Sequence, residues 1–396
     1  MELLPLKGLK VLDLTNIIMG PYATQLLGDL GAEIIKVETP DGDIMRGMGA
    51  GKSEKMASIF LGTNRNKRSI VLNLKKEPHK LVLWKLIEKT DIFIHNMRPA
   101  KLDLLGFSYK KILKKNKKII FTALYGYGKG GKYFERPAFD DIIQGLSGIS
   151  GLYLRKKTRP ELIPTLIADK TIGLLASSAV LAAYIKRLKN NLGSCIEISM
   201  FEGMVSYTLL EHQYGDIFSP SLEKAGYPRL LTKYRKPFKT ADGYICVLPY
   251  TKKQWINFID IMNITKLKDE KNFFSNLNKP DKLNKYYSII EKYKKNKNTK
   301  QLINLFTDND IPHGEVNTIE NLRENSHLKE TNFFRTFRHP TEGKLSIPDT
   351  GIKFNNKSLP IRIHQPNLGE HTVEILKELN FKDDKIEEII LSTSKK

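Results

Sequence analysis

Short apolar runs separated by helical segments and loops occupy the first half of the chain, and this alternation restricts the fold more than any other feature of the sequence. Runs of this length flanked by helices are typical of parallel strands that are buried on both faces. We expect strands at 10–14, 33–37, 69–74, 91–95, 118–124 and 195–199, and helices at 22–30, 78–89, 104–115, 170–188 and 200–212. The sequence therefore predicts an α/β fold with a parallel sheet covered by helices.

A change of composition near residue 219 divides the chain. Residues 219–240 are rich in Pro, Gly, Lys and Arg, which is typical of a linker. A strand at 243–248 then opens a smaller α/β segment, and an irregular stretch with several prolines follows before a last helix at 372–379. The predicted organisation is a large domain (1–218), a linker (219–240), a small domain (241–316), a return linker (317–365) and a C-terminal part of the large domain (366–396).

The chain carries a formal net charge of +22, from 65 basic and 43 acidic residues. A basic excess can indicate a nucleic-acid partner. Here the excess is mostly lysine and is spread along the chain, and its dense runs at 110–118 and 291–300 have the spacing of a solvated face or loop. We therefore expect a basic surface or an anionic small molecule, and no nucleic acid. A non-enzymatic nucleic-acid-binding protein stays an alternative, which steep salt-dependent retention on DNA would reveal.

The two cysteines and the apolar segments bear on the compartment. Cys195 and Cys246 each lie in an apolar run, so we expect two buried small side chains rather than a disulfide, as in a reducing cytoplasm. The longest apolar stretch, 172–185, is shorter than a membrane-spanning helix, and residues 1–10 lack the pattern of a signal peptide. No cysteine pair or histidine spacing suits a metal site. We expect a cytoplasmic protein without membrane or metal.

The glycine-rich segment Gly126–Gly131 (GYGKGG) matches the spacing of a dinucleotide-binding loop and follows a predicted strand. In such a fold a helix should begin at once, because its N-terminus holds the pyrophosphate. The following residues, 132–137 (KYFERP), are a poor helix start, and no acidic residue lies near position 151. A loop that glycine permits is the better interpretation.

Asp169 lies between the apolar run 162–168 and the predicted helix from residue 170. An aspartate in this place is most often a helix N-cap. The same position also suits an ionised nucleophile, because helix-terminal N–H groups favour the carboxylate form. Such a carboxylate can attack an acyl carbonyl and form a mixed anhydride. From the residues alone, both interpretations stay open.

Seven segments, in order along nearly the whole chain, resemble the family III CoA-transferases of the CaiB/BaiF type, which also include formyl-CoA transferases and the acyl-CoA racemases. The first is GLKVLDLTNIIMGPYATQLLGDLGAEIIKVETPDGDIMR (8–46). The others are NKRSIVLNLK (66–75), HNMRPAKLDLLGF (95–107), RPAFDDIIQGLSG (136–148), IADKTIGLLA (167–176), TADGYICVLP (240–249) and LGEHTVEILKEL (368–379). Each piece is weak by itself, whereas seven in the same order are a strong match.

The resemblance implies a reaction and a nucleophile. Asp169 matches the family's acyl-accepting aspartate, which forms first an anhydride with the donor acyl group and then an aspartyl-CoA thioester. CoA then passes to a small carboxylic acid. Acyl-CoA is a substrate in this scheme, and no permanently bound cofactor is expected.

The resemblance also implies CoA contacts and an assembly. By motif match the contacts are Ile17, Ile18, Leu72, Lys75, Asn96, Met97, Arg98 and Phe139. The family fold has a Rossmann-like large domain and a small α/β domain, and two chains form a homodimer of interlocked rings.

Departures from the family pattern reduce the number of reactions that we expect of this chain. Racemases have a histidine base where this chain has Phe139, and a phenyl ring cannot carry a proton, so racemisation is disfavoured. Formyl-CoA transferases have a glutamine where Ile18 stands and a run of glycines where this chain has PYTKK (249–253), so exchange between formate and oxalate is doubtful. Whether Asp140 or Asp141 takes part stays open.

Overall fold

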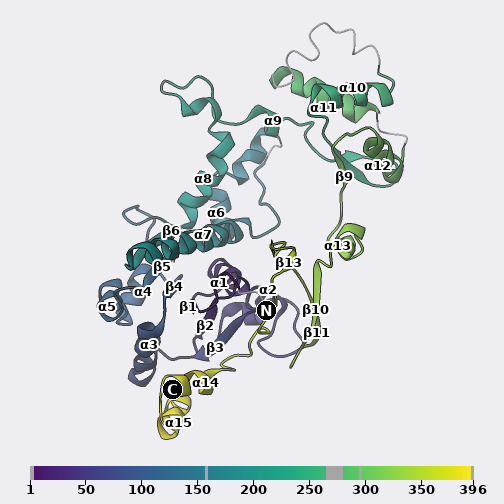
Figure 1. Ribbon diagram of the computed structural model, residues 1–396. Helices are drawn as coiled ribbons and strands as arrows, with labels where there is room; N and C mark the ends of the chain where they lie inside the picture. The colour runs from purple at the N-terminus through teal and green to yellow at the C-terminus, as the bar shows by residue number, and fades with distance from the viewer. Residues whose placement is uncertain (1–3, 157–158, 265–279, 294–296, 394–396) are drawn as a thin grey trace. The chain divides into compact units, whose positions relative to one another are not determined.

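The computed structural model of this protein describes residues 4–156, 159–264, 280–293 and 297–393 (Figure 1). The chain divides into two compact units. Unit 1 comprises Met1–Gly148, Leu162–Tyr207 and Asn332–Lys396, and unit 2 comprises Ile149–Glu161 and Thr208–Thr331. Compared with the predicted domains, the segment at 149–161 groups with unit 2, and residues 332–365 group with unit 1. The basic run at 291–300 lies partly outside the described residues.

Unit 1 is built on a six-stranded sheet in the order β3-β2-β1-β4-β5-β6, with every neighbouring pair parallel. The strands are β1 (Lys10–Leu14), β2 (Glu33–Glu38), β3 (Lys67–Val71), β4 (Ile92–His95), β5 (Ile120–Tyr125) and β6 (Ser194–Ser199). The predicted parallel sheet is confirmed. Among the predicted strands the largest error in position concerns β3, which begins two residues before the expected strand at 69–74 and ends at Val71.

Helices cover both faces of this sheet. On one face α3 (Glu77–Lys89), α5 (Tyr109–Lys115), α14 (Thr372–Glu378) and α15 (Asp383–Leu391) enclose a continuous apolar core with the strands. The C-terminal part of the chain returns to unit 1, where α14 lies against β3 (Figure 1). On the other face lie α1 (Met19–Asp29) and α7 (Ile167–Asn190), which pack against each other and against the strands.

Two helix boundaries differ from the prediction for identifiable reasons. Helix α1 begins at Met19, three residues before the expected start at residue 22, and it accommodates Pro21 because the first turn of a helix needs no hydrogen-bonded N–H there. The expected helix at 104–115 is instead α4 (Pro99–Leu104) and α5, separated at Gly106, whose φ of 97° interrupts the helix.

The environment of the cysteines and the length of α7 also differ from the prediction. Cys195 and Cys246 are free, as expected, but both are exposed rather than buried. Cys195 lies on β6, the edge strand of the sheet. Helix α7 has 24 residues and is long and apolar enough to cross a membrane by composition, so the expectation that no segment has this length is wrong.

Unit 2 contains a three-stranded antiparallel sheet in the order β7-β8-β9 and several helices. Its core is formed by β7 (Phe238–Lys239), β8 (Tyr244–Val247), β9 (His313–Glu315), α10 (Lys252–Ile261), α11 (Pro280–Tyr293) and α12 (Thr299–Asp308). Capping boxes begin both α10 and α12.

The remaining α-helices and strands of the two units are α2 (Ser58–Thr63), α6 (Asp140–Leu146), α8 (Met200–His212), α9 (Pro228–Leu231), α13 (Ser326–Glu330), β10 (Phe334–His339), β11 (Gly343–Pro348), β12 (Lys353–Phe354) and β13 (Lys357–Ser358).

Candidate active site

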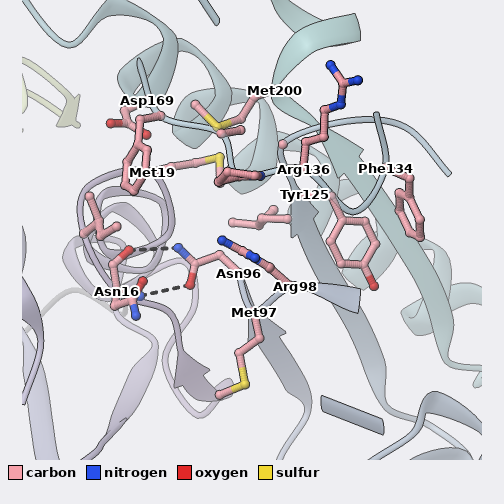
Figure 2. A pocket seen from close by; sticks show the side chains of 16 residues that line it. Asn16, Met19, Asn96, Met97, Arg98, Tyr125, Phe134, Arg136, Asp169 and Met200 are labelled. Atoms are coloured by element: carbon pink, nitrogen blue, oxygen red, sulfur yellow. Dashed lines mark hydrogen bonds between the residues drawn. The ribbon is translucent and has the colours of Figure 1, made fainter. Parts of the chain in front are cut away.

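A pocket of about 190 Å³ lies at the carboxyl ends of β1, β4 and β5 (Figure 2). The strand order reverses between β1 and β4, so the loops that follow these two strands diverge and leave a crevice, where α/β proteins commonly bind ligands. Its walls are Asn16, Ile17, Met19, Asn96, Met97, Arg98, Leu124, Tyr125, Gly126, Phe134, Arg136, Pro137, Ala138, Phe139, Asp169 and Met200. All of them belong to unit 1.

The loop after β1 is held in an unusual conformation. Asn16 and Asn96 pair across the crevice, with Asn16 N–H donating to Asn96 Oδ1 at 3.1 Å and Asn96 Nδ2 donating to the Asn16 carbonyl at 2.9 Å. Ile17 has φ 71°, a left-handed backbone that is costly for a β-branched residue. Its N–H donates to Asp43 Oδ1 at 3.0 Å, and the buried Lys36 holds Asp43 at 2.9 Å. Buried polar groups below the loop therefore fix its shape.

Asp169 lies at one end of the pocket beside Met19 and Met200 (Figure 2). It is the third residue of α7, which begins at Ile167 after the N-cap Leu166, so of the two interpretations of Asp169 the N-cap is wrong. The side chain is largely buried, and none of the described residues donates a hydrogen bond to its carboxylate. Burial, together with the nearby carboxylate of Asp140, raises the pKa of Asp169 to about 7. The group is therefore divided between its acid and its nucleophilic carboxylate form at neutral pH.

Asp140 connects α6 to the start of α7. It is buried, and its Oδ1 accepts the backbone N–H of Asp169 at 3.0 Å, while its Oδ2 accepts Gln144 Nε2 at 2.7 Å. Its neighbour Asp141 is exposed and does not line the pocket. Of the two carboxylates that the sequence left open, the structure brings Asp140 to the candidate nucleophile.

Two guanidinium groups supply positive charge. Arg98 reaches into the pocket from the loop after β4, and Arg136 stands at its rim with its guanidinium turned outward (Figure 2). The guanidinium of Arg136 stacks 4.4 Å from the ring of Tyr133. Guanidinium groups bind phosphate and carboxylate in a bidentate manner, so the part of the pocket lined by Arg98 and Arg136 suits an anionic ligand. Among the described residues no cluster of three or more His, Cys, Asp or Glu side chains could hold a metal.

The sequence profile of CoA-transferase family III matches residues 6–372. The chain belongs to this family. It is an enzyme that acts between acyl-CoA thioesters and carboxylic acids. Because residues 6–372 are nearly the whole chain, the match includes both units.

Similar proteins include transferases that differ in the acids named for them. A human succinyl-CoA:glutarate CoA-transferase is 29% identical over 96% of this chain and 87% of its own length. A cinnamoyl-CoA:phenyllactate CoA-transferase of Clostridium sporogenes is 27% identical over 96% and 95%, and a formyl-CoA:oxalate CoA-transferase of Bradyrhizobium sp. is 28% identical over 97% and 96%. The crystal structure of a CAIB/BAIF family protein from Brucella suis superposes with a TM-score of 0.79 at 26% identity, over 95% of this chain and 99% of that one.

The structure brings most of the predicted site residues of this CoA-transferase together. Asp169 and five of the predicted contacts line the pocket, namely Ile17, Asn96, Met97, Arg98 and Phe139. Three others do not line it: Ile18 and Leu72 are buried, and Lys75 is exposed just after β3.

The sequence also missed residues that line the pocket. The main ones are Asn16, Met19, Tyr125, Arg136 and Met200. Three of them, Asn16, Tyr125 and Met200, lie at or just after the carboxyl end of a strand, and this rule would have identified them. The glycine-rich segment at 126–131 is a loop, as predicted, and its first residue lines the pocket.

Proposed function

We propose that this CoA-transferase works by covalent catalysis on Asp169. The observation that carries the proposal is a buried carboxylate without a hydrogen-bond donor among the described residues, at the end of a pocket whose other side presents Arg98. A poorly solvated carboxylate is more nucleophilic than a hydrated one, and a dry pocket protects an anhydride from hydrolysis.

The reaction has two exchanges in each half. An Asp169 oxygen attacks the thioester carbonyl, the C–S bond breaks, and CoA leaves as thiolate, which gives a mixed anhydride. The thiolate then attacks the aspartyl carbonyl of that anhydride, which releases the donor acid as carboxylate and leaves an aspartyl-CoA thioester.

The second half repeats the exchange with the acceptor. Its carboxylate attacks the aspartyl thioester and expels the thiolate, which forms a new anhydride. The thiolate attacks the acceptor's acyl carbonyl, and the new acyl-CoA leaves with the Asp169 carboxylate restored. No net proton is consumed, and the thioester energy is retained throughout.

For CoA binding we propose that different predicted contacts bind different parts of the molecule. Arg98 binds a phosphate of CoA, with Asn96, Met97, Ile17 and Phe139 forming the surrounding surface. Lys75 is a second phosphate partner in this proposal, because it is exposed and free to reach solvent. The buried Ile18 and Leu72 contribute through their backbones, since their side chains pack inside the fold.

For the acid substrates, the pocket supports a carboxylic acid with an apolar body. Met19 and Met200 lie beside Asp169, and methionine side chains adapt to different apolar shapes. The relatives act on acids as different as glutarate, oxalate and phenyllactate. A panel that includes dicarboxylic and aromatic acids therefore suits the first assays.

The alternative on the same fold is racemisation at the α-carbon of an acyl-CoA. Phe139 lines the pocket where a proton carrier would be needed, and its ring has no titratable group. Incubation of acyl-CoA with the enzyme in D₂O tests this alternative: we expect no deuterium at the α-carbon.

The exposed side of α7 supports a homodimer, which we propose to be interlocked. Leu174, Leu175, Ile185 and Leu188 are exposed by 46–67%, although the opposite side of the helix packs against α1 and the sheet. A second copy of the chain explains this apolar face better than a membrane, because α7 is built into the sheet's own cover. Light scattering during size-exclusion chromatography should give about twice the monomer mass without detergent.

We also propose that the enzyme works in the cytoplasm and has no nucleic-acid partner. The free, exposed thiols of Cys195 and Cys246 support a reducing compartment. We expect binding to CoA and no steep salt-dependent retention on immobilised DNA.

The experiment that tests the reaction is intact-mass measurement after mixing the enzyme with acyl-CoA thioesters, followed by peptide mapping under hydroxylamine. We expect a hydroxamate or CoA adduct at Asp169. The Asp169→Asn variant should give no adduct, whereas Asp141→Asn, a neighbouring exposed carboxylate, should behave as the wild type. Absence of any adduct with a thioester that the enzyme turns over would refute the covalent route.

A further inference from the structure

We propose that Gln144 is a positioning residue for the nucleophile: its side-chain amide fastens the segment before α7 to Asp140 and so fixes the helical turn that carries Asp169. The inference rests on the proposed role of Asp169. It concerns a residue of α6 that does not line the pocket and acts only through others.

The amide of Gln144 is buried, with 1% of the residue exposed, and both of its ends are used. Oε1 accepts the N–H of Ile163 at 2.8 Å. Nε2 donates to the carbonyls of Ile163 and Thr165, each at 3.3 Å, and to Asp140 Oδ2 at 2.7 Å. The side chain therefore pairs with the Ile163 peptide as a neighbouring strand would, by one donor and one acceptor.

Apart from Gln144, the segment before α7 is held by local contacts, among them the hydrogen bond from Lys170 Nζ to Thr165 Oγ1 at 2.6 Å. The N–H of Thr165 donates to the Ile163 carbonyl and the N–H of Ile167 to the Thr165 carbonyl, both at 2.7 Å and both two residues apart. These are three-residue turns, and Leu166, with φ −71° and ψ 69°, has the backbone of an inverse γ-turn. Leu166 is also the N-cap of α7 and offers no side-chain cap. Without a capping side chain, the start of α7 depends on contacts from α6.

Asp140 completes the link. One of its oxygens accepts from Gln144 and the other accepts the N–H of Asp169, so the carboxylate bridges the anchor and the nucleophile's own backbone. The amide group also keeps Asp140 oriented, because an N–H donor can only face a lone pair. Attack on a carbonyl needs the nucleophile within a fraction of an ångström of its productive position, so loss of this link should slow the chemical step.

Four variants separate positioning from general stability. Gln144→Ala removes all four hydrogen bonds. Gln144→Glu keeps the acceptor for Ile163 but replaces the donor to Asp140 with an oxygen. The double variant Gln144→Glu/Asp140→Asn exchanges the amide and the carboxylate, which restores a hydrogen bond between positions 140 and 144 and the original number of carboxylates.

Gln25→Ala is the matched control. Gln25 is a buried glutamine of α1 whose amide also pairs with backbone, donating to the Gly62 carbonyl at 3.2 Å and accepting from Arg65 N–H at 3.1 Å. It does not line the pocket.

The measurements are the rate of adduct formation at Asp169, KM for acyl-CoA, and the melting temperature. We expect Gln144→Ala and Gln144→Glu to lower the adduct rate about 10- to 100-fold with KM within about threefold of the wild type. The exchange variant should be at least about tenfold faster than Gln144→Glu alone. Gln25→Ala should lower the melting temperature comparably while the adduct rate per folded molecule is unchanged.

Other outcomes overturn the inference in distinguishable ways. If the wild type forms an adduct and the Gln144 variants form it at the same rate, Gln144 does not position the nucleophile, and the proposed function stands. If Gln25→Ala slows the adduct as much as Gln144→Ala, the effect is one of stability only. If the wild type itself forms no adduct, the proposed function fails and the inference fails with it.

Discussion

Replacement of Asp169 by asparagine should stabilise the folded enzyme above pH 7 while it abolishes the reaction. The pKa of this carboxyl is raised from an ordinary 3.8 to about 7, first by burial and then by Asp140. Below pH 3.8 the group is protonated in both the folded and the unfolded chain. Between 3.8 and 7 the folded chain keeps a proton that the unfolded chain has lost, so wild-type stability falls as the pH rises. Above about 7 the full cost of the buried charge is present.

The magnitude follows from the shift. About three pH units at 1.36 kcal/mol each correspond to about 4 kcal/mol, which is an upper bound for the free energy that a neutral isostere recovers at pH 8. Asparagine loses the attraction of a carboxylate to the N-terminus of α7, about 0.3–1 kcal/mol. Since Asp169 is 8% exposed, solvent screening is weak and the burial cost dominates. We expect a net gain of about 2–3 kcal/mol at pH 8 and less than about 1 kcal/mol at pH 4.5.

Urea denaturation at pH 4.5, 6 and 8 measures this difference in the free energy of unfolding. Asp141→Asn is the control, because Asp141 is an exposed carboxylate in the first turn of α6 and its removal should change stability by less than about 0.5 kcal/mol at every pH. A stability difference between Asp169→Asn and wild type that does not grow with pH, or an asparagine variant that is less stable at pH 8, would refute the argument that Asp169 is a costly buried charge.

Three further outcomes are expected. The rate of adduct formation should rise with pH through about 7, since only the carboxylate attacks; a rate that is flat between pH 5 and 8 contradicts the raised pKa of Asp169. Arg98→Gln should raise KM for acyl-CoA about tenfold and leave kcat within about threefold, measured by steady-state kinetics at two salt concentrations; an unchanged KM would remove Arg98 from the phosphate site. Gly173→Ala should destabilise the fold by about 1–3 kcal/mol in urea denaturation, because a Cβ there would lie 2.8 Å from the Met19 carbonyl between α1 and α7. Gly145→Ala in α6, with nothing within 4 Å, should be neutral or stabilising, and an equal loss at both sites would exclude the packing explanation.

The parallel sheet could be predicted because its information is local. Strands β1, β4 and β5 are short, mostly apolar and buried runs, and burial on both faces leaves that pattern in the sequence whatever the neighbours are. The start of α7 could not be predicted in this way. Asp169 has the chemistry of an N-cap, whereas the helix begins at Ile167 behind Leu166, an N-cap without a side-chain hydrogen bond, held by turns and by a glutamine about twenty residues away. Interactions at such sequence distance leave no local signal.

The residues of the candidate site also include some that the sequence predicts and others that only the structure shows. Asp169 and the loop residues Ile17, Asn96 and Arg98 were predicted because each lies in a segment that resembles the family at a position where the family has a functional residue. Gln144 lies within one of the resembling segments, but the resemblance gives it no role. Its role is visible only where the carbonyls and N–H groups of 163–165 are placed beside it.

The two walls of the pocket are built in the same way, and this explains how the pocket can be both rigid and reactive. The loop after β1 keeps its left-handed Ile17 because Asp43 accepts its N–H and Lys36 holds Asp43 from below. The turn before α7 keeps Asp169 in place because Asp140 accepts its N–H and Gln144 holds Asp140. In both walls a carboxylate behind the surface binds the backbone, and a second buried polar group orients that carboxylate. The difference is charge: Lys36 neutralises Asp43, whereas the neutral amide of Gln144 leaves the charge of Asp140 in place. The negative charge of Asp140 therefore helps to raise the pKa of the Asp169 carboxyl to about 7. Lys36 behind Asp43 only fixes the shape of the pocket, whereas Gln144 behind Asp140 fixes the shape and also leaves a charge that raises the pKa of the nucleophile.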